Sequence, residues 1–213
     1  MKYKAVLFDL DGVIVCTDEC HYKGWKKLAD EEGIYFDREI NRRQRGVSRM
    51  ESLDILLEKS EKTYTDEQKR EMAERKNNYY REYIKTLTPE DILPGVMPFC
   101  EKLKADGVKI AIGSSSKNTP AILKGIGLDT YFDAVADGNQ ITKSKPDPEV
   151  FLLAAKLVDT DPADCMVVED AEAGVEAALA GGMDVLGLGD AVANSPATYK
   201  AQSLAAFDYS NIE

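Results

Sequence analysis

Hydrophobic residues gather in short runs along this chain, and the length of these runs predicts β-strands. Each run is three to five residues long and rich in Val, Ile, Leu and Ala. A helix needs a longer apolar pattern, whereas a strand that is buried on both faces reads as a short continuous run. The predicted strands are Ala5–Phe8, Lys109–Gly113, Phe132–Ala136, Met166–Val168 and Asp184–Leu188.

Helix-like segments separate these strands. The predicted core helices are Pro98–Ala105, Thr119–Gly125, Pro148–Leu157 and Glu172–Ala180. Strands that alternate with helices form crossover units, in which the strands run parallel and the helices cover the sheet. We therefore expect an α/β protein with a Rossmann-like parallel sheet and helices on both faces.

The segment between the first two strands is an exception, because it is helical throughout. Residues 17–87 contain no convincing strand, and two capping boxes, Ser48 to Glu51 and Thr65 to Gln68, mark helix starts. The cap helices are expected at Glu19–Glu32, Arg38–Arg43, Arg49–Glu58 and Asp66–Thr86. Since a simple crossover needs far fewer residues, we predict a core of residues 1–16 and 88–213 with an inserted all-helical cap domain of residues 17–87.

Charge and composition exclude several classes of protein. The 213 residues carry a formal net charge of -11, which disfavours nucleic acid as a partner because phosphate backbones bind basic surfaces. No stretch approaches the ~20 apolar residues of a membrane span, and the first apolar run is too short for a signal peptide. The four cysteines form no Cys-x-x-Cys pair, as is usual for reduced thiols in the cytosol. We therefore expect a cytoplasmic protein with no nucleic-acid or membrane partner. Its expected state is a monomer, although charge and composition do not fix the oligomeric state.

Reactive polar side chains follow four of the predicted strands. They are Asp9 and Asp11 after the first, Ser114 to Asn118 after the second, Lys143 to Asp147 after the third, and Glu169 with Asp170 after the fourth. The carboxyl ends of parallel strands lie along one edge of a sheet, where open α/β folds bind ligands. We therefore expect four carboxylates, a hydroxyl-rich turn and a lysine at one rim.

This set of groups suits phosphoryl transfer assisted by a divalent cation. Clustered carboxylates need a counter-ion, and a ligand set made only of oxygen favours Mg²⁺. Ser114 and the N–H groups of Ser115 and Ser116 could cradle phosphate oxygens, while Lys145 offsets the phosphate charge. One aspartate would attack to form an aspartyl-phosphate, and the other would move the proton.

Each group also has a simpler interpretation. The serines could form a solvated turn, Lys143 and Lys145 could be surface charges, and Glu169 with Asp170 could cap the helix at Glu172. All of these groups fall at strand ends of one sheet, which favours a shared site. Other reaction classes lack their motifs, since there is no P-loop, no complete dinucleotide-binding glycine pattern and no Gly-x-Ser-x-Gly.

Four motifs, in order and spacing, resemble those of the haloacid dehalogenase-like superfamily. They are DLDGV, SSS, KSKPDP and VVEDAEAG, and the helical insert is similar to the cap of that superfamily. The resemblance implies that Asp9 is the nucleophile and Asp11 the acid/base, with Ser114 and Lys145 as phosphate-binding residues. The implied Mg²⁺ ligands are Asp9, the Asp11 carbonyl, Glu169 and Asp170.

Within the superfamily, the chain resembles the β-phosphoglucomutases through HYKGW, RGVSRMESL and RKNNYY in the cap and SSSKNTP in the core. The resemblance implies that Arg49 holds the phosphate that is remote from the chemistry. It also implies that His21 and Lys76 couple cap closure to the position of Asp11. The implied substrate-binding residues are His21, Trp25, Arg45, Gly46, Val47, Arg49, Lys76, Ser115, Ser116, Lys117 and Asn118.

The function implied by this resemblance is that of a Mg²⁺-dependent phosphomutase. It would interconvert β-glucose 1-phosphate and glucose 6-phosphate through phospho-Asp9 and β-glucose 1,6-bisphosphate, so its partners would be small sugar phosphates. The first alternative is a sugar-phosphate phosphatase of the same superfamily, in which water attacks phospho-Asp9. An alternative of another class is a phospho-accepting regulatory module, which would need neither a cap nor Asp11.

Three of the implied cap residues also have structural interpretations. Arg49 could be a solvated residue of a first helical turn, Trp25 could belong to the cap core, and Lys76 could be one of the solvated lysines of a charged helix face. Three departures from the family pattern bear on sugar preference and turnover. They are Arg45 in place of lysine, and Cys16 and Ala171 in place of polar residues.

Overall fold

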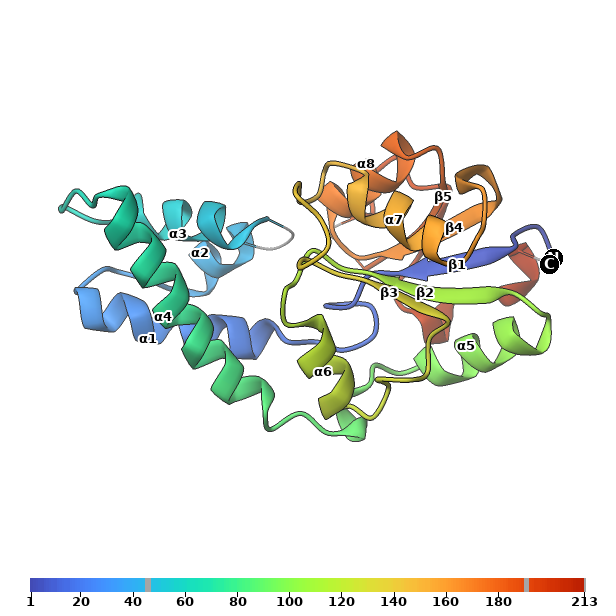
Figure 1. The fold of residues 1–213 in the computed structure, drawn as a ribbon, viewed down its shortest axis with the longest axis horizontal. Coiled ribbons are helices and arrows are strands. Elements are labelled where there is room, and N and C mark those ends of the chain that lie inside the picture. The colour runs from blue at the N-terminus through green and yellow to red at the C-terminus, as the bar shows by residue number, and fades with distance from the viewer. Residues whose placement is uncertain (45–46, 190–191, 213) are drawn as a thin grey trace.

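The structure is a computed structural model of the chain, and it describes residues 1–44, 47–189 and 192–212. Within these residues the core is one sheet of six parallel strands in the order β3-β2-β1-β4-β5-β6 (Figure 1). The strands are β1 (Ala5–Phe8), β2 (Lys109–Gly113), β3 (Ala134–Ala136), β4 (Cys165–Glu169), β5 (Asp184–Leu188) and β6 (Tyr199–Ala201). Because β1 lies between β2 and β4, its carboxyl end reaches the middle of the ligand-binding edge.

Every predicted helix is present in the structure. The described α-helices are α1 (Asp18–Glu32), α2 (Arg38–Arg43), α3 (Arg49–Leu57), α4 (Asp66–Ile84), α5 (Val96–Ala105), α6 (Thr119–Gly125), α7 (Glu149–Leu157) and α8 (Glu172–Ala180). Helix α5 begins at Val96, two residues before the predicted start at Pro98. Proline is tolerated in the first helical turn, because the N–H groups of that turn have no partner within the helix. Within the described ranges, no helix is both long enough and apolar enough to cross a membrane.

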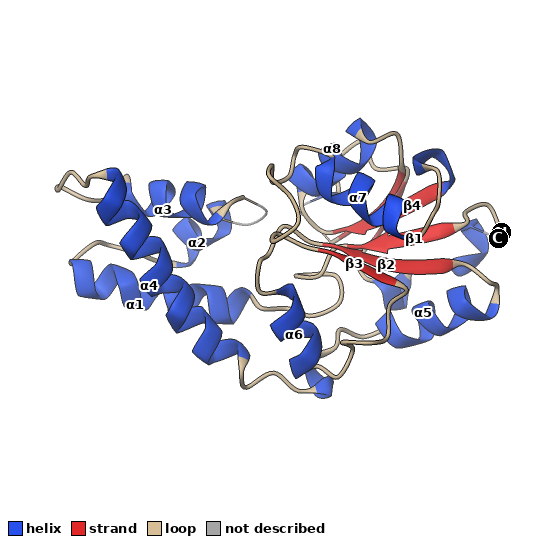
Figure 2. Ribbon diagram, in the orientation of Figure 1, coloured by secondary structure: helices blue, strands red, loops and turns tan. Residues whose placement is uncertain are grey.

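Helices cover both faces of the sheet, as predicted (Figure 2). Val6 and Phe8 of β1 pack in one apolar cluster with residues of α5 and α6. Ala5 and Leu7 of the same strand pack in a second cluster with residues of α7 and α8. All four side chains are fully buried. This two-sided burial explains why the strand sequences show continuous apolar runs without alternation.

The edge strand β6 was missed by the sequence prediction, which gave five strands. It is three residues long, Tyr199 and Ala201 are only partly buried, and Lys200 is exposed. An edge strand is covered less completely than a central one, so it needs no apolar run. The pattern that identified the other strands is therefore absent here.

The helices α1 to α4 form an apolar cluster of their own, as an inserted cap requires. Its most buried members include Trp25, Leu28, Leu53, Leu56 and Met72. Both predicted capping boxes are present, one at Ser48 and Glu51 before α3 and one at Thr65 and Gln68 before α4. The helical cap is confirmed, while its boundaries at residues 17 and 87 stay a prediction.

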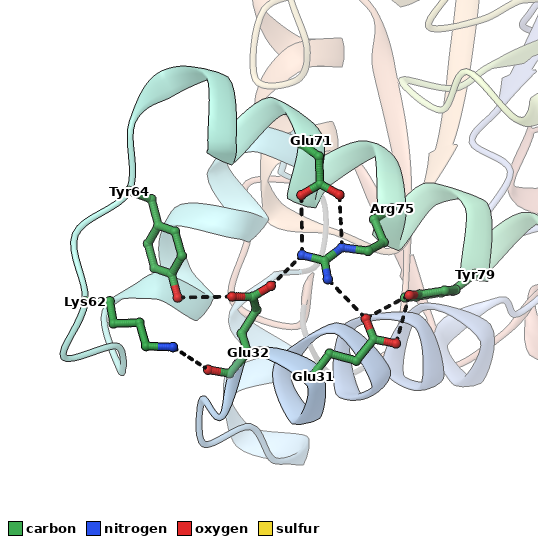
Figure 3. A network of polar contacts seen from close by, with 7 residues as sticks. All are labelled: Glu31, Glu32, Lys62, Tyr64, Glu71, Arg75 and Tyr79. Carbon is green, nitrogen blue, oxygen red and sulfur yellow. Dashed lines mark hydrogen bonds and ion pairs between the residues drawn. The ribbon is translucent and has the colours of Figure 1, made fainter.

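A network of polar contacts ties α4 to α1 (Figure 3). The Arg75 guanidinium lies 3.3 Å from an oxygen of Glu31 and 2.5 Å from an oxygen of Glu32, both on α1. Tyr79 donates its hydroxyl to Glu31 at 2.8 Å. Single surface ion pairs contribute only about 0–1 kcal/mol, but a network that shares one arginine fixes geometry. Since Lys76 follows Arg75 directly, this network also fixes the rotation of α4 that buries Lys76.

The chain enters and leaves the cap through two adjacent segments. Val15, just before α1, forms a β-bridge with Ile92, which lies between α4 and α5. The Leu93 N–H donates to the Ile14 carbonyl at 2.9 Å. The two connections between core and cap therefore run side by side.

Candidate active site

A cleft of about 950 Å³ is lined by the carboxyl edge of the sheet and by the cap helices. Every described residue that the sequence predicted for the site lines this cleft. The core residues are Asp9, Asp11, Ser114, Ser115, Ser116, Lys117, Asn118, Lys145, Glu169 and Asp170. The cap residues are His21, Trp25, Val47, Arg49 and Lys76. The predicted residues Arg45 and Gly46 lie outside the described residues.

Three carboxylates meet where β1 and β4 end. Oxygen atoms of Asp9, Glu169 and Asp170 all lie within 4.8 Å of one another. Burial, together with the charges of Glu169, Asp9 and Asp11, raises the pKa of Asp170 to about 9. A shift in this direction means that the fully charged cluster is unfavourable without a cation. The donor set, which consists only of oxygen, fits a hard divalent cation.

Lys145 is a cation within this cluster. Its Nζ donates to Asp9 Oδ1 at 2.5 Å and to Glu169 Oε2 at 2.8 Å. Burial alone would lower the pKa of Lys145, but the charges of Asp9 and Glu169 outweigh it and hold this pKa above its ordinary value. Lys145 therefore stays protonated beside Asp9. The surface-charge interpretation is wrong for Lys145, whereas Lys143 is exposed and pairs with Asp147 at 3.2 Å.

Asp11 lies beside the cluster, and the first residue of the predicted cap holds its side chain. Thr17 donates to one Asp11 oxygen from its N–H at 2.6 Å and to the other from its hydroxyl at 2.8 Å. The Tyr80 hydroxyl donates to Thr17 Oγ1 at 3.1 Å, which links Asp11 to α4. An anchored carboxylate outside the three-carboxylate group suits proton transfer better than metal binding through its side chain.

The serine turn after β2 is more tightly bonded than the sequence indicates. Ser114 is buried, and its Oγ accepts the Ser116 N–H at 3.2 Å. Ser116 Oγ in turn accepts the Asn118 N–H at 3.2 Å. The solvated-turn interpretation does not describe Ser114. One N–H that was expected to cradle phosphate, that of Ser116, is already bonded to a hydroxyl, so a phosphate would have to replace that contact.

The cap brings a buried lysine and a histidine to the cleft. Lys76 is 3% exposed, so the solvated-lysine interpretation is wrong. Its Nζ lies 2.9 Å from His21 Nδ1 and 4.7 Å from the centre of the Trp25 ring. His21 Nε2 lies 3.8 Å from an Asp11 oxygen. Trp25 is fully buried in the cap cluster and also lines the cleft, so both interpretations of Trp25 hold.

Arg49 begins α3 and reaches the cleft from the cap. Its Nη1 lies 3.3 Å from Glu74 Oε2, and its side chain is 29% exposed. Burial lowers the pKa of Arg49, with the charge of Glu74 acting against the shift. A glutamate that is itself exposed compensates the Arg49 charge only weakly. Arg49 can therefore exchange this contact for an anionic ligand.

The burial of Lys76 predicts that anion binding in the cleft depends on pH. Burial and the nearby Arg49 charge lower the pKa of Lys76 to about 7, so its positive charge is lost as the pH rises through that value. Sulfate keeps its own charge between about pH 6 and 8, and its affinity is expected to fall several-fold over this range. Calorimetric titration with sulfate at each pH measures this change.

Two lysine variants separate this effect from other titrations. Lys76→Met should weaken sulfate binding at low pH and remove the pH dependence. Lys143→Met, which changes an exposed lysine of the same cleft, should keep it. A sulfate affinity that is independent of pH in the unsubstituted protein would contradict the prediction.

Several residues of the site were not predicted from the sequence. Thr17 holds Asp11, Glu74 pairs with Arg49, and the Asn118 amide donates to Asn77 Oδ1 at 3.0 Å. This last contact joins α4 of the cap to the loop after β2. Asn77 lies within RKNNYY, one of the motifs that carry the resemblance, but only Lys76 of that motif was predicted for the site. A lone threonine or glutamate gives no signal.

Comparisons with known proteins identify relatives along most of the chain. Residues 3–182 match the model of the haloacid dehalogenase-like hydrolase family. A β-phosphoglucomutase of Bacillus subtilis is 46% identical over 188 residues, which cover 87% of this chain and 83% of the relative. A phosphorylated carbohydrates phosphatase of Thermotoga maritima is 32% identical over 85% of this chain and 82% of the relative.

A solved structure agrees with these sequence relatives. The crystal structure of a β-phosphoglucomutase from Clostridium difficile superimposes with a TM-score of 0.91 and 38% identity. The match covers 99% of this chain and 95% of that one. The whole fold, including the helical cap, is therefore shared with that protein.

Proposed function

The chain is an enzyme of the haloacid dehalogenase-like hydrolase family, and from this premise we propose that it interconverts β-glucose 1-phosphate and glucose 6-phosphate. The observation that carries the proposal is the presence of cations on both sides of one cleft. Lys145 lies with Asp9 on the core side, and Arg49 and Lys76 lie on the cap side. A mutase must hold a sugar that carries two phosphates, whereas a phosphatase needs one anion site.

The proposed cycle starts with a phosphoryl group on Asp9. The sugar binds through its own phosphate to the cap cations, and its free hydroxyl attacks the phosphorus of phospho-Asp9. Asp11 takes the proton of that hydroxyl as the bond between phosphorus and the Asp9 oxygen breaks. For β-glucose 1-phosphate the product is β-glucose 1,6-bisphosphate, and Asp9 is a free carboxylate again.

The second half of the cycle reverses these roles. The bisphosphate turns around, so the phosphate at C1 faces Asp9 and the phosphate at C6 faces the cap. Asp9 attacks the phosphorus at C1, and Asp11 returns its proton to the C1 oxygen that leaves. Glucose 6-phosphate is released, and phospho-Asp9 is restored. No proton or phosphoryl group is lost, so a trace of bisphosphate suffices to start turnover.

Contacts among the described residues support each of these proposed steps. Thr17 holds both oxygens of Asp11, which fixes the proton-transferring group relative to Asp9. Lys145 keeps Asp9 oriented and offsets the charge of an incoming phosphate. Mg²⁺ is the proposed cofactor, held by Asp9, Asp170 and the Asp11 carbonyl with Glu169. When bound, it would neutralise charge on the transferring phosphoryl group.

The alternative function is hydrolysis of a sugar phosphate with the same core residues. It is supported by the 32% identity to the Thermotoga maritima phosphatase. In that reaction water, and not a sugar hydroxyl, attacks phospho-Asp9. The positions of Arg49 and Lys76 on the cap side of the cleft favour the mutase. Two cations there suit a second anion site, which hydrolysis does not need.

One assay tests the proposal and its alternative together. The protein is incubated with β-glucose 1-phosphate, Mg²⁺ and a trace of β-glucose 1,6-bisphosphate, and both glucose 6-phosphate and free phosphate are measured. We expect glucose 6-phosphate to form in large excess over phosphate, with no turnover of the α-anomer as a matched control. Free phosphate equal to the sugar phosphate consumed would overturn the mutase proposal. The monomeric state and the cytoplasmic location stay predictions.

A further inference from the structure

The buried carboxylate Glu169 folds back over the start of α8, where it contacts two backbone N–H groups and the side chain of Lys145. Its Oε1 accepts the backbone N–H groups of Asp170 and Ala171, each at 3.0 Å. Its Oε2 accepts the Lys145 Nζ at 2.8 Å. The side chain is 1% exposed. These contacts require room for a glutamate carboxylate directly against the first turn of the helix.

That room exists because residue 174 has no side chain. A Cβ built on Gly174 would lie 1.8 Å from Glu169 Oε2, 2.0 Å from its Cδ and 2.5 Å from its Cγ. Contacts under about 3 Å do not occur between such atoms, so Glu169 and a side chain at residue 174 cannot occupy this space together. Gly174 cannot move aside, because it lies within α8 and its N–H is bonded to the Ala171 carbonyl at 3.1 Å.

The backbone gives no other reason for glycine at this position. Gly174 is absent from the residues with positive φ, whereas Gly12, which packs against Asp170, has a φ of 87° that already favours glycine. Within a helix, glycine is less favourable than alanine. The space taken by the Glu169 carboxylate is thus the feature of the described structure that requires Gly174.

We propose that Gly174 is a positioning residue of the metal and phosphate centre. Because residue 174 has no side chain, the Glu169 carboxylate can occupy the space beside α8 from which it holds Lys145. A side chain at residue 174 would push the Glu169 carboxylate away from the Lys145 Nζ and from the two backbone N–H groups. Lys145 would then keep only Asp9 among its two carboxylate partners. The geometry of the three-carboxylate cluster, and with it the affinity for a divalent cation, would change.

The effect on turnover rests on the proposed function, but the effect on cation binding does not. The test therefore measures the affinity for Mn²⁺, a divalent cation whose unbound form gives a resonance signal in solution. Gly174→Ala is expected to weaken Mn²⁺ binding at least tenfold. Gly125→Ala is the matched control, because it also changes a helical glycine but its added Cβ would meet no atom closer than 3.4 Å. It should leave Mn²⁺ binding unchanged.

A second pair of variants separates positioning from general damage to the fold. Glu169→Ala removes the Cγ, the Cδ and both carboxylate oxygens, and with them every atom that the built Cβ would meet within 2.5 Å. In the Glu169→Ala background, Gly174→Ala is expected to change Mn²⁺ affinity and the midpoint of thermal unfolding very little, less than about threefold for the affinity. Such non-additivity is the signature of two residues that compete for one space.

Three outcomes would overturn the proposal. The first is a Mn²⁺ affinity that Gly174→Ala leaves unchanged in the Glu169 protein. The second is an equal loss of affinity in both backgrounds. The third concerns a Gly174→Ala protein that does not fold: the double variant with Glu169→Ala must then fold and bind Mn²⁺ as Glu169→Ala alone does, and its failure to do so overturns the proposal. The mutase assay plays no part in this decision, so the proposed function and the role of Gly174 can fail separately.

Discussion

The Asp9→Asn variant is expected to have no measurable mutase activity, with a loss of at least ~10⁴-fold, as is typical when a catalytic nucleophile is removed. An amide cannot attack phosphorus or carry a phosphoryl group as an aspartyl-phosphate. The change is nearly isosteric, and the amide can still accept a hydrogen bond from Lys145. The fold should therefore survive, which a circular dichroism spectrum checks.

Two measurements bear on this variant. One is turnover of β-glucose 1-phosphate, and the other is protein-bound phosphate that hydroxylamine releases, which should disappear. Asp164→Asn is the matched control, since Asp164 is partly exposed and pairs with Lys4 at 2.7 Å at the opposite end of β4. It should keep both activity and the labile phosphate. Near-normal turnover by Asp9→Asn would assign the nucleophile to another group.

Arg49→Ala is expected to lower mutase turnover by about 10²-fold while leaving slow hydrolysis of a small acyl phosphate nearly unchanged. Hydrogen bonds to charged groups contribute roughly 1.5–3 kcal/mol each, so the loss of a paired contact to the remote phosphate accounts for this factor. A small acyl phosphate has no second phosphate, and its reaction at Asp9 needs only the core residues. The variant thus separates the cap site from the chemistry.

Both rates are measured on the same preparations of the two proteins. Arg42→Ala is the matched control in the cap, because Arg42 is 68% exposed and pairs only weakly with Glu39 on its own helix. It should lose neither rate. Equal loss of both rates by Arg49→Ala would mean that Arg49 serves folding. Retention of both rates would contradict a remote-phosphate site at Arg49 and, with it, the mutase proposal.

Much of the core could be predicted from the sequence because its strands are buried on both faces. The continuous apolar runs gave β1, β2 and β5 with their observed bounds, and the residues that follow β1, β2 and β4 do line one cleft. Parallel strands bring their carboxyl ends together by topology alone. No knowledge of side-chain contacts was needed to gather Asp9, Ser114 and Glu169 at one edge.

Contacts within the site could not be predicted, because they depend on how separate elements face one another. The hydrogen bond from Asn118 to Asn77 joins residues from the core and from the cap, and nothing in either local sequence indicates the other. The burial of Lys76 depends on the packing of α4 against α1, which the charged sequence of α4 conceals. The role of Gly174 requires the position of the Glu169 side chain, which the motif alone does not contain.

The side-by-side connections at Val15 and Ile92 have a consequence for how this architecture can change. Because the cap begins and ends at neighbouring points, it connects to the sheet in the way that a surface loop does. This holds whatever the length of the inserted chain. Insertions whose ends lie close together add little strain to their host. Over evolution, the cap could therefore be exchanged for another module, or shortened to a turn, without rearranging the strands that carry Asp9 and Glu169. In such a lineage, substrate choice would vary with the inserted module while the phosphoryl-transfer chemistry of the core stayed the same.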